Sequence, residues 1–310
     1  MNHTPVLLNE VIAAIAPAPG MRVVDATFGA GGYTRAITAR GAEVLGIDQD
    51  PHVIANAEVP NGAQLAHGKF GDLANIAQVK NFTPVDGVVF DIGVSSMQLD
   101  QAERGFSFMH DGPLDMRMSQ AGQSAADVVN SFREEDIANI IYQYGEEPQS
   151  RKIARYITRA REEVRIETTA QLAEIVARAV RGKPGQHPAT RTFQALRIYV
   201  NDELAQLQAG LEAATSILKP GGKLVVVTFH SLEDRIVKEF FAAASGAQES
   251  ISRHMPAPVQ DKTEPKLTIQ QRKVVTPTAA ECMANPRARS AKLRTAVRTP
   301  FFECMMEIAA

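Results

Sequence analysis

A glycine-rich segment directly follows a short run of apolar residues that ends in a carboxylate. The run is Met21 to Asp25, and the segment is Asp25-Ala-Thr-Phe-Gly-Ala-Gly-Gly32. The run predicts a buried strand, and the segment predicts a tight turn into a helix that starts near Tyr33. Gly29 and Gly31 would let the backbone approach a ligand closely, beside the free amides of a helix start. This arrangement predicts a nucleotide-type binding loop at the carboxyl edge of a parallel sheet.

A second carboxylate indicates that the ligand contains a ribose. Asp48 ends the next apolar run, Glu43 to Asp48, and stands 17 residues after Gly31. A carboxylate at this place can accept hydrogen bonds from both ribose hydroxyls, and NAD enzymes use the same contact. A dinucleotide fold would place a third glycine three residues after Gly31, but Thr34 stands there. The pattern therefore favours a methyltransferase loop over an NAD site.

The elements that must position these residues follow the alternating pattern of a parallel α/β sheet. Further strands are predicted at Ala63 to Ala66, Val85 to Asp91 and Lys223 to Phe229. Between the last two the alternation is missing, and the chain shows helix periodicity instead. We therefore predict a helical module that is inserted between the fourth and fifth strands of the sheet.

The predicted domain boundaries assign 1–101 and 200–310 to the core and 102–199 to the insert. Two helices of the insert should begin at capping boxes, in which each of two side chains bonds the other residue's backbone amide. The predicted boxes are Ser131 with Glu134 and Thr168 with Gln171. A long helix from Phe193 to Leu207 should lead back to the sheet, a loop should cover 246–268, and 272–275 should pair with 293–298 as a hairpin.

Two clusters of basic residues stand out against a net charge of only −2. One follows a face of a predicted helix in the insert, and its members are Arg151, Arg155 and Arg159. The other lies in a run without any acidic residue, and its members are Arg287, Arg289 and Arg294. Because local patches and not the mean charge govern phosphate binding, both clusters are candidates for contact with RNA. The alternative is that both are ordinary solvated faces.

The composition indicates a folded protein without a membrane or metal component. With 45% hydrophobic and 22% charged residues among 310, the chain can bury a sizeable core. No apolar run is long enough to cross a bilayer, and the first residues lack the features of a signal peptide. Cys282 and Cys304 show neither metal-ligand nor disulfide spacing. We expect a reduced, cytoplasmic compartment and no bound metal.

Beyond these patterns, sequence blocks along the whole chain resemble one family closely. The blocks are His3 to Glu10, Asp25 to Gly32, Gly46 to Pro51, Asp91 to Asp100, Arg104 to Phe108, Pro113 to Met118, Thr192 to Ile198, Val200 to Leu204, Phe229 to Arg235 and Asn285 to Arg294. Together they resemble the MraW family of ribosomal RNA small-subunit methyltransferases. The resemblance implies a Rossmann-like class I methyltransferase core with an inserted helical substrate-recognition domain.

The resemblance also implies an activity and a cofactor site. Members of the family use S-adenosylmethionine to methylate N4 of a cytosine, cytosine 1402, in the decoding centre of 16S ribosomal RNA. Carried over by position, the cofactor-binding residues would be Gly31, Gly32, Tyr33, Asp48, Phe70, Asp91 and Gln98, beside Gly29 of the loop. The sequence departs from the family at two of these places, with Tyr33 for the usual His and Met97 for a frequent Pro before Gln98.

For the chemistry we expect direct, in-line methyl transfer, with the protein aligning the reacting atoms and holding the amine. Asp91 should bind the cofactor, and Ser95 or Ser96 should line the amine site. His230 could accept the proton after transfer, and the alternative is a histidine that hydrogen-bonds within its own turn. Phe106 and Phe108 could stack on RNA, with core packing as the alternative, and Asp115 with Arg117 could be a structural pair.

Other functions remain open at this stage. A methyltransferase for DNA or protein would keep the same loop and differ at the acceptor. An NAD-binding enzyme would want a glycine at Thr34, and a non-catalytic RNA-binding protein would not need Gly29, Gly31 and Asp48 together. We expect 16S ribosomal RNA as the partner, as free RNA or within the small subunit. The oligomeric state, a homodimer included, stays open.

Overall fold

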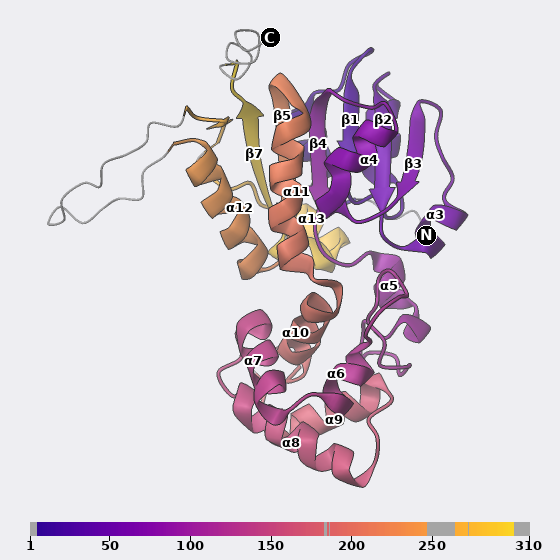
Figure 1. Cartoon of the computed structure of the whole chain (residues 1–310), viewed down its shortest axis with the longest axis vertical. Helices are drawn as coiled ribbons and strands as arrows, with labels where there is room; N and C mark the ends of the chain where they lie inside the picture. The colour runs from indigo at the N-terminus through magenta and orange to yellow at the C-terminus, as the bar shows by residue number, and fades with distance from the viewer. Residues whose placement is uncertain (1–4, 183–184, 186, 247–263, 272, 301–310) are drawn as a thin grey trace, which may run out of the picture. The chain divides into compact units, whose positions relative to one another are not determined.

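The computed structural model describes residues 5–182, 185, 187–246, 264–271 and 273–300. The chain divides into two compact units. We call them the sheet unit, made of Met1–Gly93 and Leu204–Ala310, and the helical unit, Val94–Glu203. Each unit has hydrophobic core residues of its own. Figure 1 labels the helices and strands of both units.

The sheet unit is built on a seven-stranded sheet in the order β3-β2-β1-β4-β5-β7-β6. The strands are β1 Arg22–Asp25, β2 Glu43–Asp48, β3 Ala63–His67, β4 Val85–Asp91, β5 Leu218–Thr228, β6 Leu267–Ile269 and β7 Lys292–Arg298. The first five are parallel to their neighbours, whereas β7 is antiparallel to β5 and β6 is antiparallel to β7. The predicted α/β, Rossmann-like fold class is confirmed.

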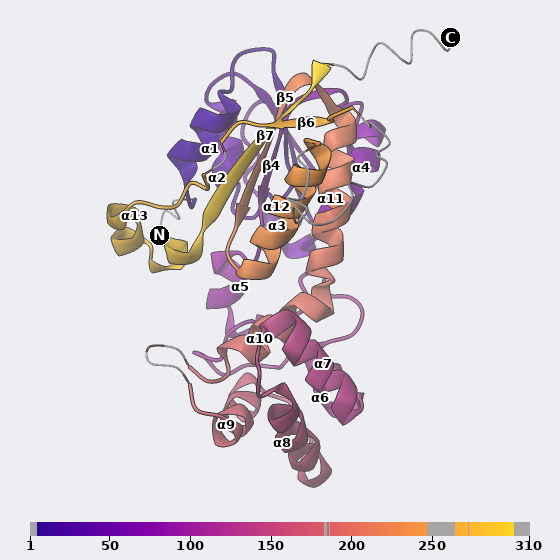
Figure 2. The same ribbon diagram turned by 90° about the vertical axis from the view of Figure 1, so that its left-hand side faces the viewer.

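Helices cover both faces of this sheet. They are α1 Leu8–Ile15, α2 Gly32–Thr38, α3 Pro51–Asn56, α4 Leu73–Val79, α11 Glu203–Ile217, α12 Ser231–Ala244 and α13 Ala279–Ala284, with short 3-10 turns at Phe70–Asp72 and Pro286–Ser290. Figure 2 shows α1 and α2 on one side of the strands and α4, α11 and α12 on the other.

The sequence of β4 shows why both faces are buried. Val88 and Phe90 pack in the core with α4, α11 and α12, while Val89 between them packs in the opposite core with α1 and α2. Successive side chains of a strand point to opposite faces, so a continuous apolar run belongs to a strand that is covered twice. β1, β2 and β4 end at Asp25, Asp48 and Asp91, so these residues lie at the same carboxyl edge of the sheet.

The carboxyl-terminal end of the sheet differs from the predicted hairpin. β7 matches the predicted 293–298 strand, but it pairs with β5 on one side and with β6 on the other, and β6 starts at Leu267 inside the predicted loop. The predicted 272–275 strand contributes one bridge, between Val275 and Leu293. The rest of the predicted loop, 247–263, and residue 272 lie outside the described residues.

The helical unit packs its helices around a separate apolar core. The elements are α5 Ser96–Asp100, a 3-10 turn at Ala102–Arg104, α6 Ala125–Ser131, α7 Glu134–Gly145, α8 Ser150–Glu163, α9 Thr169–Ala179 and α10 Thr190–Asn201. Ile153 and Ile157 of α8 are fully buried, and their spacing of four residues places them on one face of the helix. The box of Thr168 with Gln171 caps α9 and is confirmed.

Two helix predictions in this unit are wrong. Ser131 does not cap α7, because it ends α6 and its hydroxyl donates to Asp127 O at 2.5 Å; α7 begins after Arg133 without a side-chain cap. The predicted long helix is two helices, α10 and α11, because Asp202 adopts the left-handed conformation at φ 52°. One such residue ends the run of helical hydrogen bonds although the apolar spacing continues.

No helix in the described part of the chain is both long and apolar enough to span a membrane.

Candidate functional site

The glycine loop joins β1 to α2 and adopts a conformation that favours glycine. Gly29 has φ 51° and Gly31 has φ 71°. Gly31 N donates to Phe28 O at 2.7 Å, which closes the turn before the helix. A Cβ atom at Gly31 would lie 2.7 Å from Cζ of Phe28, whereas one at Gly29 would meet nothing closer than 3.9 Å. The Phe28 ring therefore occupies the space beside Gly31, whereas the space beside Gly29 is open to a ligand.

Asp48 at the end of β2 holds this loop in place. Its Oδ2 accepts the amide of Gly29 at 2.8 Å, and its Oδ1 accepts the amide of Asp50 at the same distance. Burial raises the pKa of Asp48, and the two amide bonds oppose the rise. Each carboxylate oxygen can accept more than one hydrogen bond, so these contacts still leave Asp48 able to accept from ligand hydroxyls.

Two more carboxyl groups end β1 and β4 and have oxygens without a protein partner. Asp25 is 1% exposed; its Oδ2 accepts Thr34 Oγ1 at 2.7 Å, but its Oδ1 has no hydrogen-bond partner among the described residues. In Asp91 the buried Oδ1 likewise lacks a partner there. Because buried polar atoms are almost always hydrogen-bonded, two orphan acceptors at one sheet edge indicate a missing donor or cation.

Burial also changes the ionisation of both groups. It raises the pKa of Asp91 to about 8, with the negative charges of Asp25 and Glu233 adding to the effect. It raises the pKa of Asp25 to about 6, against the opposing hydrogen bond from Thr34. Strongly perturbed carboxyl groups at the carboxyl edge of a parallel sheet are typical of a binding site.

Gly32 and Tyr33 contact the amino-terminal segment. A Cβ atom at Gly32 would lie 2.1 Å from Cγ of Pro5. The Tyr33 side chain is buried, and its hydroxyl donates to Val6 O. The Tyr33 side chain therefore anchors the amino-terminal segment, and its backbone is the part that can contact a cofactor.

Phe70 stands in the 3-10 turn after β3. Its ring meets the ring of Phe90 edge-on, with centroids 5.8 Å apart. Gly210 of α11 lies against it, and a Cβ there would come within 3.0 Å of Phe70 Cδ2. The half-buried ring is held in place by these two neighbours, which suits a residue that packs against a flat ligand group.

His230 caps α12. Its Nδ1 accepts the amide of Glu233 at 3.4 Å, and its Nε2 lies 2.7 Å from Glu233 Oε1. Oε2 of Glu233 accepts the amides of Phe229 and His230. Both ring nitrogens therefore face the same residue, as in the alternative of a histidine that bonds within its own turn.

Ser95 and Gln98 belong to the helical unit, not to the unit that carries the glycine loop. The Ser95 hydroxyl accepts the Gln98 amide at 3.2 Å, and Gln98 Oε1 accepts the Ser95 amide at 3.1 Å. The two residues form the capping box of α5. The structure thus brings Gly29, Asp48 and Asp91 together in one unit, and it places Ser95 and Gln98 at the first turn of the other.

The basic residues divide into two kinds. Arg151, Arg155 and Arg159 are exposed along one face of α8, where Arg155 Nε approaches Glu134 Oε1 to 3.8 Å. Arg287 and Arg289 are exposed in the 3-10 turn before β7. Arg294 is different, because its Nε donates to Asp234 Oδ1 at 2.8 Å while Lys292 binds the other oxygen at 2.9 Å. The run without acids in sequence meets an acid from α12 in space.

Phe106, Phe108 and the pair of Asp115 with Arg117 make their contacts within the helical unit. Phe106 is buried in its core, and Phe108 stacks on His187 with ring centroids 4.6 Å apart. Core packing is therefore the outcome for Phe106. Asp115 and Arg117 form a two-pronged pair of 2.6 and 2.9 Å. The pair lies inside the helical unit.

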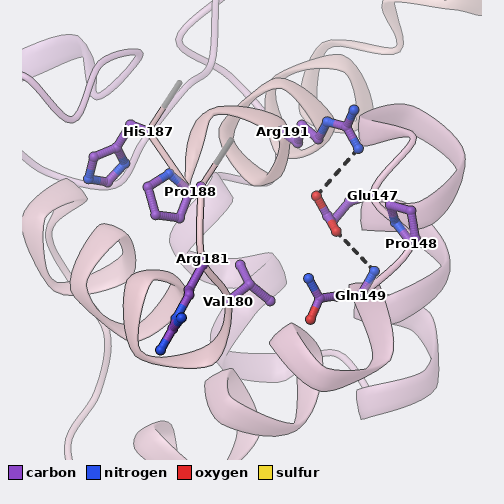
Figure 3. Close-up of a pocket in the computed structure, with 9 residues that line it drawn as sticks. Glu147, Pro148, Gln149, Val180, Arg181, His187, Pro188 and Arg191 are labelled. Carbon is purple, nitrogen blue, oxygen red and sulfur yellow. Dashed lines mark hydrogen bonds and ion pairs between the residues drawn. The ribbon is translucent and has the colours of Figure 1, made fainter. Parts of the chain in front are cut away.

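Figure 3 shows a cavity of about 190 Å³ in the helical unit, and none of the predicted site residues lines it. Arg181, His187 and Arg191 line it, and Arg191 Nη1 lies 3.5 Å from Glu147 Oε2. Its volume is below the roughly 300 to 1,000 Å³ of ordinary small-molecule sites. We therefore base the candidate site on the sheet edge. Among the residues that the structure describes, no three His, Cys, Asp or Glu side chains gather as metal ligands.

The sequence reasoning did not include Asp25 or Glu233 in the site. Asp25 was predicted to end its strand, and that position at the sheet edge was the available signal. Glu233 gave none, because it stands three residues into a helix that covers the sheet and is fully buried there.

A parallel sheet with a glycine loop after β1, a carboxylate after β2 and unpartnered acidic oxygens after β1 and β4 defines a Rossmann-like methyltransferase that uses S-adenosylmethionine. Residues 1–299 match the MraW methylase family. The chain belongs to that family.

Relatives of the chain are similar over nearly its whole length. A protein of Methylobacterium nodulans is 56% identical over 99% of this chain and 94% of its own length. One of Sphingopyxis alaskensis is 55% identical over 96% of this chain and 92% of its own, and one of Caulobacter vibrioides is 54% identical over 96% of each. All three carry the name ribosomal RNA small subunit methyltransferase H.

Proposed function

We propose that the protein methylates N4 of a cytosine, cytosine 1402, in 16S ribosomal RNA. The observation that carries the substrate is the near full-length similarity to relatives named small-subunit ribosomal RNA methyltransferases. S-adenosylmethionine supplies an activated methyl group on a sulfonium. The amine needs no metal or covalent nucleophile, only alignment and hydrogen-bond acceptors.

The residues at the sheet edge fit this cofactor. The loop of Gly29 and Gly31 offers close backbone approach, and Asp48 offers acceptors for ribose hydroxyls. Asp91 and Asp25 offer orphan acceptors for the positively charged part of the cofactor. Gly32 and Tyr33 contribute backbone, Phe70 a fixed ring, and Gln98 a contact carried over from the family pattern.

For the transfer itself we propose roles for Asp91, Ser95 and His230. Asp91 accepts a hydrogen bond from the amine or the cofactor through its orphan oxygen, and Ser95 lines the amine site. His230 is the weaker candidate for proton acceptor because its Nδ1 accepts the Glu233 amide and its Nε2 faces Glu233 Oε1 at 2.7 Å, although no hydrogen bond joins these last two atoms in the described part of the chain. Replacing His230 with Asn, which also caps helices, separates the roles. Activity lost in His230→Asn at unchanged stability would support a catalytic histidine.

RNA contact is proposed for the exposed arginines of α8 and of the turn before β7. Glutamate at Arg151, Arg155 and Arg159 should weaken RNA binding and lower the salt dependence by about one unit of slope per lost phosphate contact. The matched control for each single substitution is Arg133→Glu, which makes the same charge change at an exposed arginine of the same unit that already pairs with Asp136. Equal weakening by Arg133→Glu and by a single substitution on α8 would reduce the effect to net charge.

The decisive experiment identifies the methylated nucleoside. Purified protein, labelled S-adenosylmethionine and small ribosomal subunits that lack the modification are incubated, and the RNA is digested to nucleosides. We expect N4-methylcytidine, its loss in Asp48→Ala, and unchanged product in Asp72→Asn, an exposed aspartate outside the site. Label in another nucleoside would overturn the proposed target and keep the enzyme class.

A further inference from the structure

The carboxyl group that ends β4 interacts through its charge with two others, one at the end of β1 and one in the first turn of α12. They are Asp25, Asp91 and Glu233, which we call the carboxyl cluster. Asp25 is 1% exposed and Glu233 is fully buried. Oδ1 of Asp25 and Oδ1 of Asp91 have no hydrogen-bond partner in the described part of the chain. Two buried acceptors without donors are unusual in a folded protein and are expected where a ligand supplies the missing contact.

The groups that surround the cluster do not neutralise it. Tyr33 and Thr34 face it from α2 and Asp48 from β2, and none of these is a cation. His230 of α12 lies beside the cluster, with its Nε2 2.7 Å from Glu233 Oε1. Lys292 and Arg294 of β7 bind Asp234 instead.

The cluster therefore holds a proton at neutral pH. Burial, with repulsion from Asp25 and Glu233, raises the pKa of Asp91 to about 8. Interacting carboxyl groups titrate together, so the proton belongs to the cluster and not to one residue. A positive charge placed against the two orphan oxygens favours the ionised form and lowers the pKa again.

We propose that binding of S-adenosylmethionine drives a proton out of the carboxyl cluster, and that the demethylated cofactor drives out fewer. The inference rests on the proposed function, which places the cofactor at this sheet edge. S-adenosylmethionine carries a sulfonium and an ammonium, whereas its demethylated product keeps only the ammonium. The cluster thus responds to the charge that methyl transfer removes, and it favours the charged donor over the spent product.

Calorimetry of the full chain tests the proposal without any turnover. S-adenosylmethionine is titrated at about pH 7 in buffers of different ionisation enthalpy. The slope of the observed binding enthalpy against the ionisation enthalpy of the buffer gives the number of protons released. We expect close to one proton for S-adenosylmethionine and a clearly smaller number for S-adenosylhomocysteine. The dissociation constant should fall by up to about tenfold per pH unit from about pH 6 to 8 and then level off.

Variants assign the proton to the cluster. Asp91→Asn should abolish most of the release, and Asp72→Asn, an exposed aspartate elsewhere in the sheet unit, should leave it unchanged. If Asp91→Asn binds the cofactor too weakly to titrate, Asp25→Asn should reduce the proton release instead. The dissociation constant of the unaltered protein should still fall with rising pH as stated above. Binding with equal enthalpy in all buffers, or equal release with both ligands, overturns this proposal alone. Absence of cofactor binding overturns the proposed function as well.

Discussion

Alanine at Gly31 should destabilise the sheet unit much more than alanine at Gly29, although both glycines lie in one turn. Each substitution places a side chain in the left-handed region, which costs about 1–2 kcal/mol. At Gly31 the new Cβ also lies 2.7 Å from Cζ of Phe28. The Phe28 ring cannot move aside freely, because a Cβ at Gly46 on its other side would already be 2.7 Å from Cδ2. Overpacking of this kind adds about 1–3 kcal/mol.

The two variants therefore separate the fold from the site. Gly31→Ala should lose about 2–5 kcal/mol, against about 1–2 kcal/mol for Gly29→Ala. In thermal unfolding without cofactor this difference of about 1–3 kcal/mol corresponds to roughly 2–12 °C, at about 2–4 °C per kcal/mol. Gly29→Ala should instead weaken S-adenosylmethionine binding at least about tenfold in calorimetry, since its Cβ enters the space beside the loop. Equal melting temperatures for the two variants would refute the steric reasoning.

Three further changes test other parts of the structure. Tyr33→Phe removes the hydroxyl that donates to Val6 O, so limited proteolysis near the amino terminus should accelerate, with a stability loss of about 1 kcal/mol; unchanged cleavage would contradict the anchoring role. Burial alone would raise the pKa of Asp234, but its bonds to Arg294 and Lys292 outweigh this and hold the pKa below its ordinary value. Its stabilising contribution is therefore present above about pH 4 and lost as the pH falls through the lowered pKa, so Asp234→Asn should cost about 1–3 kcal/mol at neutral pH and progressively less in acid; a pH-independent difference in urea unfolding would disprove it. Asn201 accepts the amide of Met118 and donates to Met116 O, so Asn201→Ala should lower the free energy of unfolding by about 1–3 kcal/mol. An unchanged free energy of unfolding would show that the segment from Met116 to Met118 does not depend on Asn201.

Much of the sheet unit could be predicted because its signals are local. The apolar runs that end at Asp48 and Asp91 are strands with the predicted bounds, since residues buried on both faces need no partner to be recognised. The glycine loop was equally visible, because a turn with positive φ angles requires glycine wherever it lies.

The errors occur where two local signals compete. Ser131 had the spacing of a cap for α7, but its hydroxyl bonds back into α6. The apolar pattern from Phe193 to Leu207 was continuous, and periodicity does not reveal a single left-handed residue such as Asp202. For β7 the sequence could not choose between two nearby partners, since the antiparallel register depends on which segment reaches the edge.

The sequence by itself determined the bounds of β2 and β4, the glycine loop and the family, and it predicted Asp48 as a carboxylate for a ribose. Only the tertiary structure decided which charges meet. Arg294 finds Asp234 60 residues away, so an arginine from an all-basic run becomes half of an ion pair. Asp25, Asp91 and Glu233 come from three distant elements and become one interacting cluster. Charge interactions fall off with distance in space, and position along the chain does not give that distance until the sheet brings its carboxyl ends to one edge.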